Sequence, residues 1–288
     1  DTSIYRELPV ATLDTGYVGV HWDQPISSQY RLQVKANLNT LNRDEPWYVR
    51  IPYLVVSPEL SALFAQNRDL ANRFADDPVM TCASPEFVTN ARLRTVCLRL
   101  ADRNYTDLRD YTTNQNYREQ RQELEVSHLW LPNPSLRMVL GANFSHSFAS
   151  SQNFLNGEAE NTVISAFGHA EWRLSEQWLL NVGAAGERDD QSGESLSPRV
   201  ALSWQLQPNQ VIRAIHSRAV RTPDIAESQF DARYYAITDD RSQSEYDGVF
   251  YQSAVADGSA KTERIRSNEL SYFAQYQTLP LSLDLRLF

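Results

Sequence analysis

Two segments of the chain combine aromatic rings with arginines, a pairing that can bind an anionic solute. The aromatic and arginine residues are Trp47, Tyr48, Arg50 and Tyr53 in the first segment, and Arg233, Tyr234, Tyr235, Tyr246, Phe250 and Tyr251 in the second. A guanidinium group forms charge-assisted hydrogen bonds with anions, and a ring face attracts a cation placed over it. Ordinary packing within a loop is the competing explanation for each single residue.

No sequence pattern typical of catalysis or of a bound metal is present. The chain lacks the G-x-S-x-G, H-E-x-x-H and G-x-x-x-x-G-K-[ST] motifs. Its five histidines are dispersed, and although His169 and Glu171 share one parity, two ligands do not make a metal site. We therefore predict that the chain is not an enzyme and holds no cofactor or metal. A net charge of -9 argues against a nucleic-acid partner.

Cys82 and Cys97 are the only two cysteines and lie fifteen positions apart. A disulfide between them would indicate an oxidising compartment. Two unrelated thiols in a reducing compartment fit the spacing equally well, so the spacing leaves both possibilities open.

The elements that must position these residues are strands with apolar side chains at alternate positions. In the last segment Leu281, Leu283, Leu285 and Leu287 alternate with serine, aspartate and arginine, which makes one strand face aliphatic and the other ionic. About ten segments repeat this pattern and predict an all-β fold of antiparallel hairpins. The mean hydropathy of -0.49 is low, but barrel strands give a weak hydropathy signal because only every second residue is apolar.

The predicted connections alternate between short turns and longer loops, as in an outer-membrane barrel. The short ones are 23–28, 132–134, 175–176, 207–209 and 278–280, and the long ones are 41–117, 149–160, 189–195 and 221–263. All but one of the six tryptophans lie near a short turn on the apolar parity, namely Trp22, Trp130, Trp172, Trp178 and Trp204. This placement indicates an aromatic girdle at a membrane interface.

The opposite parity carries more charges than the core of a small barrel or sandwich could hold. The residues that we therefore expect to face a wide lumen are Arg31, Lys35, Glu123, Glu125, Arg137, Glu171 and Arg199. An arginine on the lipid face would cost ~2–4 kcal/mol near the bilayer midplane, so the charged parity must face away from lipid. The pattern predicts an antiparallel transmembrane β-barrel, of which these strands form a part.

Three stretches resemble the barrel domain of TonB-dependent outer-membrane receptors. LSPRVALSWQLQPNQVIRAIHSRAVRTPDIAE (196–227) has the S-P-R opening and the R-x-P ending typical of a strand pair of that family. KTERIRSNELSYFAQY (261–276) resembles a later P-E-R…E-L-G-Y strand, but has Thr262 where proline is usual and Ser271 where glycine is usual. AFGHAEWRLSEQWLLNVGAAGERDD (166–190) resembles the preceding hairpin. The resemblance covers about 160–288 well, and 1–150 only by pattern.

The resemblance implies that residues 1–288 are the middle of a 22-stranded barrel with a plugged lumen, whose plug domain would precede residue 1. Segments 41–117 and 221–263 would be extracellular loops, and in such receptors their rings and arginines are candidates for contacting an anionic metal chelate. Arg218 and Arg221 would line the lumen or pair with nearby carboxylates, and we expect pairing.

The first long loop should be partly helical. Stretches 57–77 and 84–103 each begin with a serine cap followed by proline and repeat apolar residues at helical spacing, which predicts two short helices. An extracellular position for this loop also favours the disulfide between Cys82 and Cys97.

The function implied by the resemblance is energy-coupled uptake of a scarce solute across the bacterial outer membrane, and the expected solute is a ferric siderophore. The barrel would contact outer-membrane lipid, and the plug would contact the TonB–ExbB–ExbD energy-coupling complex. Receptors for haem, cobalamin and oligosaccharides share this barrel, so the sequence does not name the solute. A passive porin, a barrel enzyme and a soluble β-rich binding protein are the alternatives.

Overall fold

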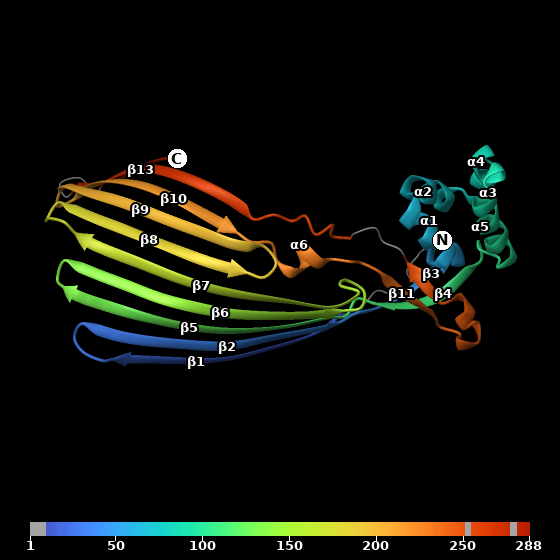
Figure 1. Cartoon of the computed structure of the whole chain (residues 1–288), viewed down its shortest axis with the longest axis horizontal. Coiled ribbons are helices and arrows are strands. Elements are labelled where there is room, and N and C mark those ends of the chain that lie inside the picture. Colours follow the sequence, from blue (N-terminus) through green and yellow to red (C-terminus); the bar gives the residue numbers. More distant parts are fainter. Residues whose placement is uncertain (1–9, 251–254, 277–280) are drawn as a thin grey trace.

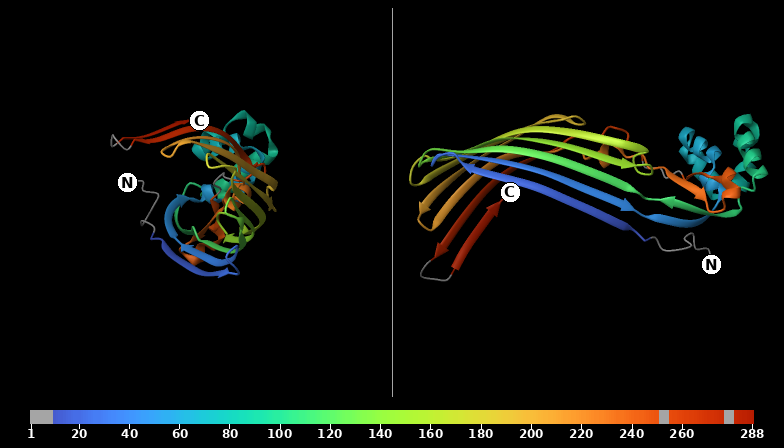
Figure 2. Two further views of the ribbon diagram at one scale, coloured as in Figure 1. Left: turned by 90° about the vertical axis from the view of Figure 1, so that its left-hand side faces the viewer. Right: turned by 90° about the horizontal axis from the view of Figure 1, so that it is seen from below.

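A long antiparallel sheet forms most of the molecule. The computed structural model describes residues 10–250, 255–276 and 281–288. The sheet contains, in spatial order, β1 (Thr12–Pro25), β2 (Tyr30–Asp44), β5 (Tyr117–Asn133), β6 (Leu136–Ser151), β7 (Gly157–Arg173), β8 (Trp178–Asp189), β9 (Gly193–Gln207), β10 (Gln210–Arg221), β13 (Glu263–Tyr276) and β14 (Leu281–Leu287). It is strongly curved (Figure 2), and within the described residues β1 and β14 are its edges. The ten strands confirm the prediction of a partial antiparallel barrel.

The strand register keeps side chains of one kind on one face. Val20, Ala36, Leu124, Phe144 and Ile164 lie opposite one another across β1, β2, β5, β6 and β7. Because successive side chains in a strand point to opposite faces, this register makes one face of the sheet apolar over its width. The strands are also long, with 17 residues in β5 and in β7, against ~5–6 for an average strand.

The connections at one end of the sheet are short, as predicted, but two predicted long loops at the other end are wrong. Strands β6 and β7 are joined by 152–156, and β8 and β9 by 190–192. Residues with positive φ close these turns, namely Asn156 and Gly157 in the first and Gly193 in the second, since such residues adopt left-handed conformations most readily. The strands therefore continue into 149–160 and 189–195. The turn predicted at 278–280 lies outside the described residues.

A smaller unit, here called the outer subdomain, lies beyond the strand ends (Figure 1). It is built from 45–116 together with the second long segment, 222–262. Its four-stranded sheet has the order β12 (Gly248–Phe250), β11 (Tyr234–Thr238), β4 (Leu108–Asn114) and β3 (Pro46–Pro52). Pairing of Ile237 with Thr112 and of Thr238 with Tyr111 joins the two segments, so the two predicted loops form one folded unit.

Four helices of the first segment lie within the two stretches predicted to be helical, each of which is divided in two, and a further short helix, α3 (Pro78–Cys82), lies between those stretches where none was predicted. After the 3-10 turn η1 (Tyr53–Val56) come α1 (Pro58–Gln66), α2 (Arg68–Asp76), α3, α4 (Pro85–Thr89) and α5 (Ala91–Asp102). The divisions fall at asparagines that cap the next helix. The Asn67 side chain accepts a hydrogen bond from the Leu70 amide, and Asn90 accepts from Arg92 and Leu93. Two short elements, α6 (Ile225–Gln229) and η2 (Arg241–Tyr246), follow β10 and β11.

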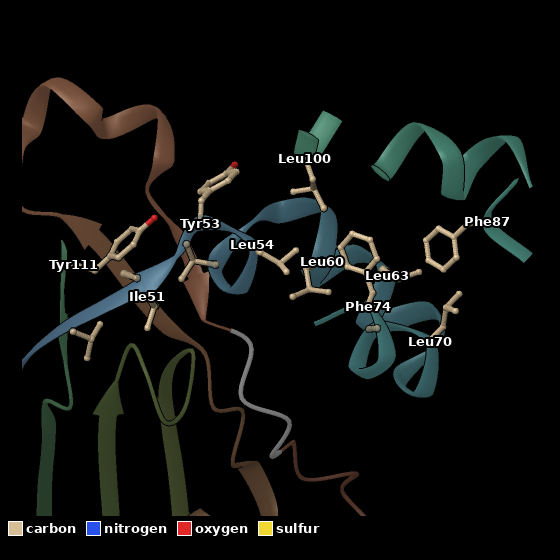
Figure 3. Packing of buried hydrophobic residues seen from close by; sticks show 14 residues of the cluster. Ile51, Tyr53, Leu54, Leu60, Leu63, Leu70, Phe74, Phe87, Leu100 and Tyr111 are labelled. Carbon is tan, nitrogen blue, oxygen red and sulfur yellow. The ribbon is translucent and has the colours of Figure 1, made fainter. Parts of the chain in front are cut away.

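The outer subdomain has a hydrophobic core of its own. Tyr53, Phe74, Phe87, Leu100 and Tyr111 are at most 1% exposed and pack with aliphatic side chains from η1, α1 and α2 (Figure 3). The Sγ atoms of Cys82 and Cys97 are bonded, which joins α3 to α5 beside this core. The subdomain is therefore a packed unit that holds its loop side chains in fixed positions.

Candidate functional site

The charged face of the ten-stranded sheet carries ion pairs between neighbouring strands. Lys35 Nζ of β2 lies 3.0 Å from Glu125 Oε1 of β5, and Asn37 Nδ2 donates to Glu123 Oε2 at 3.0 Å. Arg31 lies 3.6 Å from Asp23 of β1. These contacts pair charged side chains that would otherwise be isolated on this face. Such a face is compatible with contact to water or to a polar plug.

The remaining predicted lumen residues lie on the same charged face. Arg137 is directly opposite Glu171 across β6 and β7, and Arg199 of β9 lies opposite Gly183 and Ser217. The segment after β10 also folds onto this face, because Ile225 of α6 packs against a small cluster of Ala149, Leu155 and Ala159. That this face lines a lumen stays a prediction.

The opposite face of the sheet exposes large apolar side chains and is here called the apolar belt. Its members are Val18, Val20, Leu124, Val126, Leu140, Phe144, Ile164, Val182, Val200, Leu202, Leu270 and Leu285, all between 37% and 65% exposed. On β6 the belt runs from Leu136 to Phe144, about nine residues or ~27 Å along the strand at ~3.3 Å each. Tilted strands of that length cross a bilayer core.

Aromatic rings gather at the short-turn end of the apolar belt. The Trp178 and Trp204 rings stack with centroids 5.4 Å apart, and the Tyr30 ring stacks on Trp130 at 6.2 Å. Trp172 is 50% exposed on the same face. Amphipathic rings of this kind prefer the interface between lipid and water, so the arrangement fits an interfacial girdle.

Two of the predicted solute contacts are packed inside the outer subdomain. Tyr53 is 1% exposed, its ring meets Tyr246 edge-on at 5.1 Å, and its hydroxyl accepts a hydrogen bond from Arg103 at 3.2 Å. The Arg109 guanidinium lies 3.5 Å from the centroid of the Tyr246 ring. Both rings thus pack within the subdomain and hold η1, β4 and η2 together.

The two predicted arginine contacts each bind an aspartate. Arg50 on β3 makes a bidentate pair with Asp110 on β4, at 2.7 and 2.9 Å, and Asp110 raises the pKa of Arg50. Arg233 lies 3.0 Å from Asp231. A solute that used either guanidinium would share it with a carboxylate.

Trp47, Tyr48, Tyr234 and Tyr235 remain half-buried at the subdomain surface. Tyr48 shares one face of the small sheet with Tyr235, because Tyr48 and Ile237 both lie opposite Thr112. The Tyr235 hydroxyl lies 3.2 Å from Asn156 Oδ1, in the β6–β7 turn. Tyr251 and the Phe250 side chain lie outside the described residues, so their predicted contacts stay predictions.

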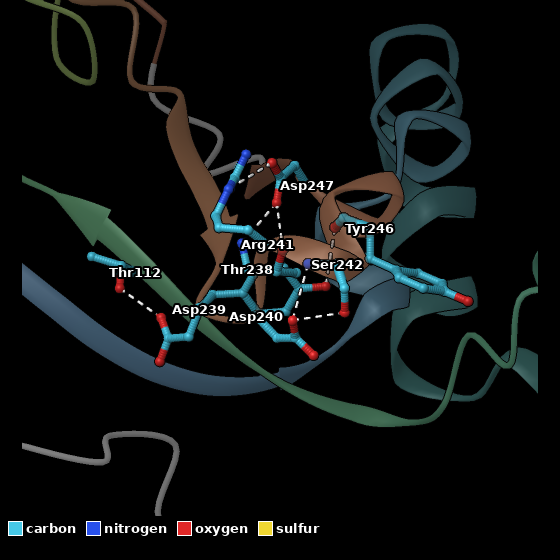
Figure 4. Close-up of polar contacts among 9 residues, drawn as sticks. Thr112, Thr238, Asp239, Asp240, Arg241, Ser242, Tyr246 and Asp247 are labelled. Atoms are coloured by element: carbon cyan, nitrogen blue, oxygen red, sulfur yellow. Dashed lines mark hydrogen bonds and ion pairs between the residues drawn. The ribbon is translucent and has the colours of Figure 1, made fainter.

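A cavity of about 480 Å³, which the sequence did not indicate, lies beside the small sheet. Its lining residues are Asp107, Leu108, Arg109, Asp110, Thr238, Asp239, Asp240 and Gln243. Ser242 donates hydrogen bonds to Asp240 (Figure 4). Gln243 donates another, and these bonds hold the pKa of the Asp240 carboxyl below its ordinary value. The only local signal in the sequence is the pair Asp239–Asp240 ahead of η2, because aspartate often caps a short helix; it indicates the cap and not the cavity.

A second aspartate of this network fastens η2 to β11. Asp247 Oδ1 accepts hydrogen bonds from the Thr238 amide and hydroxyl at 2.7 and 2.8 Å, and Asp247 Oδ2 lies 3.1 Å from Arg241 (Figure 4). Burial works to raise the pKa of Asp247, but the bonds from Thr238 and the charge of Arg241 outweigh burial and hold the pKa below its ordinary value.

The outer subdomain is anchored on the rim of the large sheet. The amides of Asp231 and Arg233 donate to the carbonyls of Phe154 and Asn153, each at 2.8 Å. The Phe154 ring also stacks on Phe230 with centroids 5.9 Å apart. The segment between β10 and β11 is therefore packed on the β6–β7 turn.

Among the residues that the structure describes, no helix is long and apolar enough to span a membrane. Within the same residues, no group of three or more histidine, cysteine, aspartate or glutamate side chains could hold a metal ion.

Comparison with known proteins places the chain in a sequence family. The model of the TonB dependent receptor-like β-barrel family matches residues 4–288, whereas no curated protein matches the chain.

Several solved structures resemble the fold. The siderophore receptor PirA from Pseudomonas aeruginosa is 10% identical, with 92% of this chain and 43% of that chain covered and a TM-score of 0.47. A mutant of the ferric enterobactin receptor PfeA from the same organism, in complex with enterobactin, is 10% identical, with 96% of this chain and 43% of that chain covered and a TM-score of 0.47. The RagAB peptide importer is 8% identical, with 96% of this chain and 30% of that chain covered and a TM-score of 0.51. The chain spans about two fifths of the length of the two siderophore receptors.

Proposed function

Since the chain belongs to the TonB-dependent receptor family, as part of its β-barrel domain, we propose that the whole protein is a bacterial outer-membrane receptor for TonB-coupled uptake of a scarce solute. One observation carries this proposal, namely the apolar belt on one face of the sheet opposite an ion-paired face. A soluble protein rarely exposes so large an apolar surface, whereas a barrel wall needs one face for lipid and one for its interior.

The solute that we propose is a ferric siderophore, bound at the outer subdomain. Trp47, Tyr48, Tyr234 and Tyr235 are the half-buried rings that a chelate could contact there. Arg50 and Arg233 would reach an anionic chelate only in competition with Asp110 and Asp231. The rings are therefore proposed as the principal contacts.

The partners that we propose follow from the same function. Outer-membrane lipid would cover the apolar belt. The TonB–ExbB–ExbD complex would supply energy through a plug domain, which would fill the interior beside the ion-paired face. Solute binding would occur at the outer subdomain, and release would follow when the plug is remodelled.

Uptake by cells tests the proposal. The full-length gene is expressed in a host lacking its own siderophore receptors, with and without TonB, and uptake of radiolabelled ferric siderophores is measured. We expect uptake that needs TonB and stops when the proton-motive force is dissipated.

Uptake that persists without TonB would favour a passive porin instead. Fractionation of the same cells tests localisation, and recovery of the full-length protein as a monodisperse species without detergent would refute the membrane assignment.

A further inference from the structure

The four-stranded sheet of the outer subdomain has one packed face and one accessible face. Tyr111 on the packed face is fully buried. Neighbouring side chains along each strand point to the other face, where Tyr48 and Ile237 lie on either side of Thr112. Ile237 is 49% exposed there. We call this accessible side, which also carries Tyr235, the ring face.

Carboxylates form the next row of the ring face. Asp110 of β4 lies beside Asp239, which follows β11, because the Asp239 amide donates to the Asp110 carbonyl at 3.1 Å. This row lies two residues from the row of Tyr48, ~7 Å at ~3.3 Å per residue. Asp107 and Asp240 line the cavity at the same edge of the sheet. A solute on the rings therefore lies within about one Debye length, ~8 Å, of several carboxylates.

The arginines near the ring face are already engaged. Arg50 is held in its bidentate pair at 2.7 and 2.9 Å. The Arg109 guanidinium lies over the Tyr246 ring and donates to Gln243. By contrast, the Asp107 side chain forms no hydrogen bond or ion pair with any residue that the structure describes. The excess charge at the ring face is therefore negative.

The same imbalance of charge extends along the second segment of the outer subdomain. Residues 222–262 contain eight acidic and three basic residues. Two of the basic residues, Arg233 and Arg241, are paired with Asp231 and Asp247. An anionic solute would therefore meet more carboxylates than available cations in this segment.

Two arginines near the end of β10 were expected to pair with carboxylates, and only one does so. Arg221 lies 2.7 Å from Glu227 and 3.6 Å from Glu263. Arg218 lies on the other face of β10, directly opposite Arg266, and has no carboxylate partner among the described residues. Arg221 is thus a further arginine whose charge is already compensated.

We propose that the solute bound at the ring face is a neutral or cationic ferric chelate of the tris(hydroxamate) type, and that Asp107 and Asp239 select against anionic chelates. In a tris(hydroxamate) complex the ligand charges cancel the charge of Fe³⁺, whereas a tris(catecholate) complex is trianionic. Aromatic faces attract a cation, and nearby carboxylates attract a cationic chelate and repel an anionic one. This inference rests on the proposed function and names the class of its siderophore.

Binding of one ferric chelate in different charge forms tests the proposal. The probes are ferrioxamine B, its N-acetyl derivative and its N-succinyl derivative, which share their iron-binding groups but are cationic, neutral and anionic at neutral pH. Affinity for the full-length receptor in detergent is measured by quenching of tryptophan fluorescence. We expect affinity to fall in that order, about tenfold from the cationic to the anionic probe, since exposed charge contacts change affinity by roughly threefold each. At ~1 M salt, where the Debye length is ~3 Å, the order should disappear.

Two double variants identify the residues responsible. D107N/D239N removes two charges from the ring face and its cavity but keeps an acceptor for the Thr112 hydroxyl, which donates to Asp239 at 2.7 Å (Figure 4). We expect its affinities for the probes to agree within about twofold. D69N/D76N is the matched control, because it removes the same charge from exposed residues of α2, and it should keep the charge order of wild type.

Equal affinity of wild type for the probes, or tighter binding of the anionic probe, would overturn the inference. An unchanged charge order in D107N/D239N would overturn it as well, because other groups would then set the selectivity.

TonB-dependent uptake by cells separates this inference from the proposed function. If ferric enterobactin, a tris(catecholate), is imported better than ferrioxamine B, the class of chelate is wrong and the receptor assignment stands. If the receptor is inserted in the outer membrane and imports neither, the proposed siderophore function is refuted together with the inference.

Discussion

Arg50 and Arg233, two predicted solute contacts, each bind an aspartate of the outer subdomain, and Tyr53, another, lies in its core. At the scale of single residues, arginine and tyrosine side chains of the kind that could bind a chelate thus hold the loops together instead. Tyr48 and Tyr235 differ from them because their rings remain partly accessible on one face of the small sheet.

Substitution of Tyr53 separates packing from solute contact. We expect Tyr53→Ala to destabilise the outer subdomain by ~3–5 kcal/mol, the usual cost of removing a buried aromatic ring. Tyr48→Ala should cost under ~1 kcal/mol of stability, as most surface changes do, while lowering siderophore uptake. Hydrogen exchange of residues 46–114 in the full-length receptor reports stability. If Tyr53→Ala lowers uptake without changing exchange, Tyr53 is a solute contact.

The pH dependence of η2 follows from Asp247. Its pKa is lowered in the folded protein, so its ionised form stabilises the fold above the ordinary aspartate pKa of ~3.9, and this contribution is lost as the pH falls through the lower, folded value. We expect the hydrogen-exchange protection factors of residues 238–247, taken relative to the intrinsic exchange rate at each pH, to fall as the pH falls below ~4. Asp247→Asn should show low protection factors at neutral pH and little further change in acid. Equal pH profiles for both proteins would contradict this account.

At the scale of elements, the outer subdomain depends on short helices that cannot be stable alone. Helices α3 and α4 contain five residues each, far below the length at which isolated helices persist in water. The Phe74–Phe87 ring contact, with centroids 5.7 Å apart, and the bond between Cys82 and Cys97 hold them against α2 and α5. The disulfide is therefore expected to matter locally rather than for the whole sheet.

Removal of the disulfide tests this local role. In the chain-entropy model a loop of 15 residues gains ~3 kcal/mol from its bridge. We expect a double variant, Cys82→Ser with Cys97→Ser, to be cleaved by protease within 78–102 while the sheet stays intact. Thr95→Ser in α5 serves as a control for a polar change that keeps the bridge. Protection equal to wild type would show that core packing alone holds α3.

At the scale of the whole molecule, the two faces of the sheet define the environment of the protein. The apolar belt and the ion-paired face alternate with a period of two residues, so two neighbouring positions on one strand experience opposite surroundings. Leu140 lies near the middle of the belt on β6, and Val139 points to the charged face.

Arginine scanning of this pair tests the orientation of the wall. We expect Leu140→Arg to destabilise the folded full-length barrel by ~2–4 kcal/mol, the cost of arginine on a lipid face near the midplane. Val139→Arg should cost much less, because it faces water or a polar plug. Reversible unfolding from lipid vesicles in guanidinium measures both. A larger cost for Val139→Arg would show that the faces are assigned the wrong way round.

The sequence by itself determined the strands, the face on which each belt residue lies, and the short turns, because alternation and turn residues act over a few neighbouring positions. Helix content near α1–α5 was predictable for the same reason. The full length of strands β6–β9 was not predictable. These strands keep pairing beyond the apolar belt, where polar residues on both faces remove the alternation of apolar and polar positions.

Only the tertiary structure decided that the two long segments form one subdomain. The pairing of Thr112 with Ile237 joins residues more than a hundred positions apart, and no local pattern encodes such a contact. The pairing of Arg50 with Asp110, and the placement of Arg218 opposite Arg266, likewise depend on strand register. Register arises from the summed packing of whole strands, so it sets which charged side chains lie opposite one another.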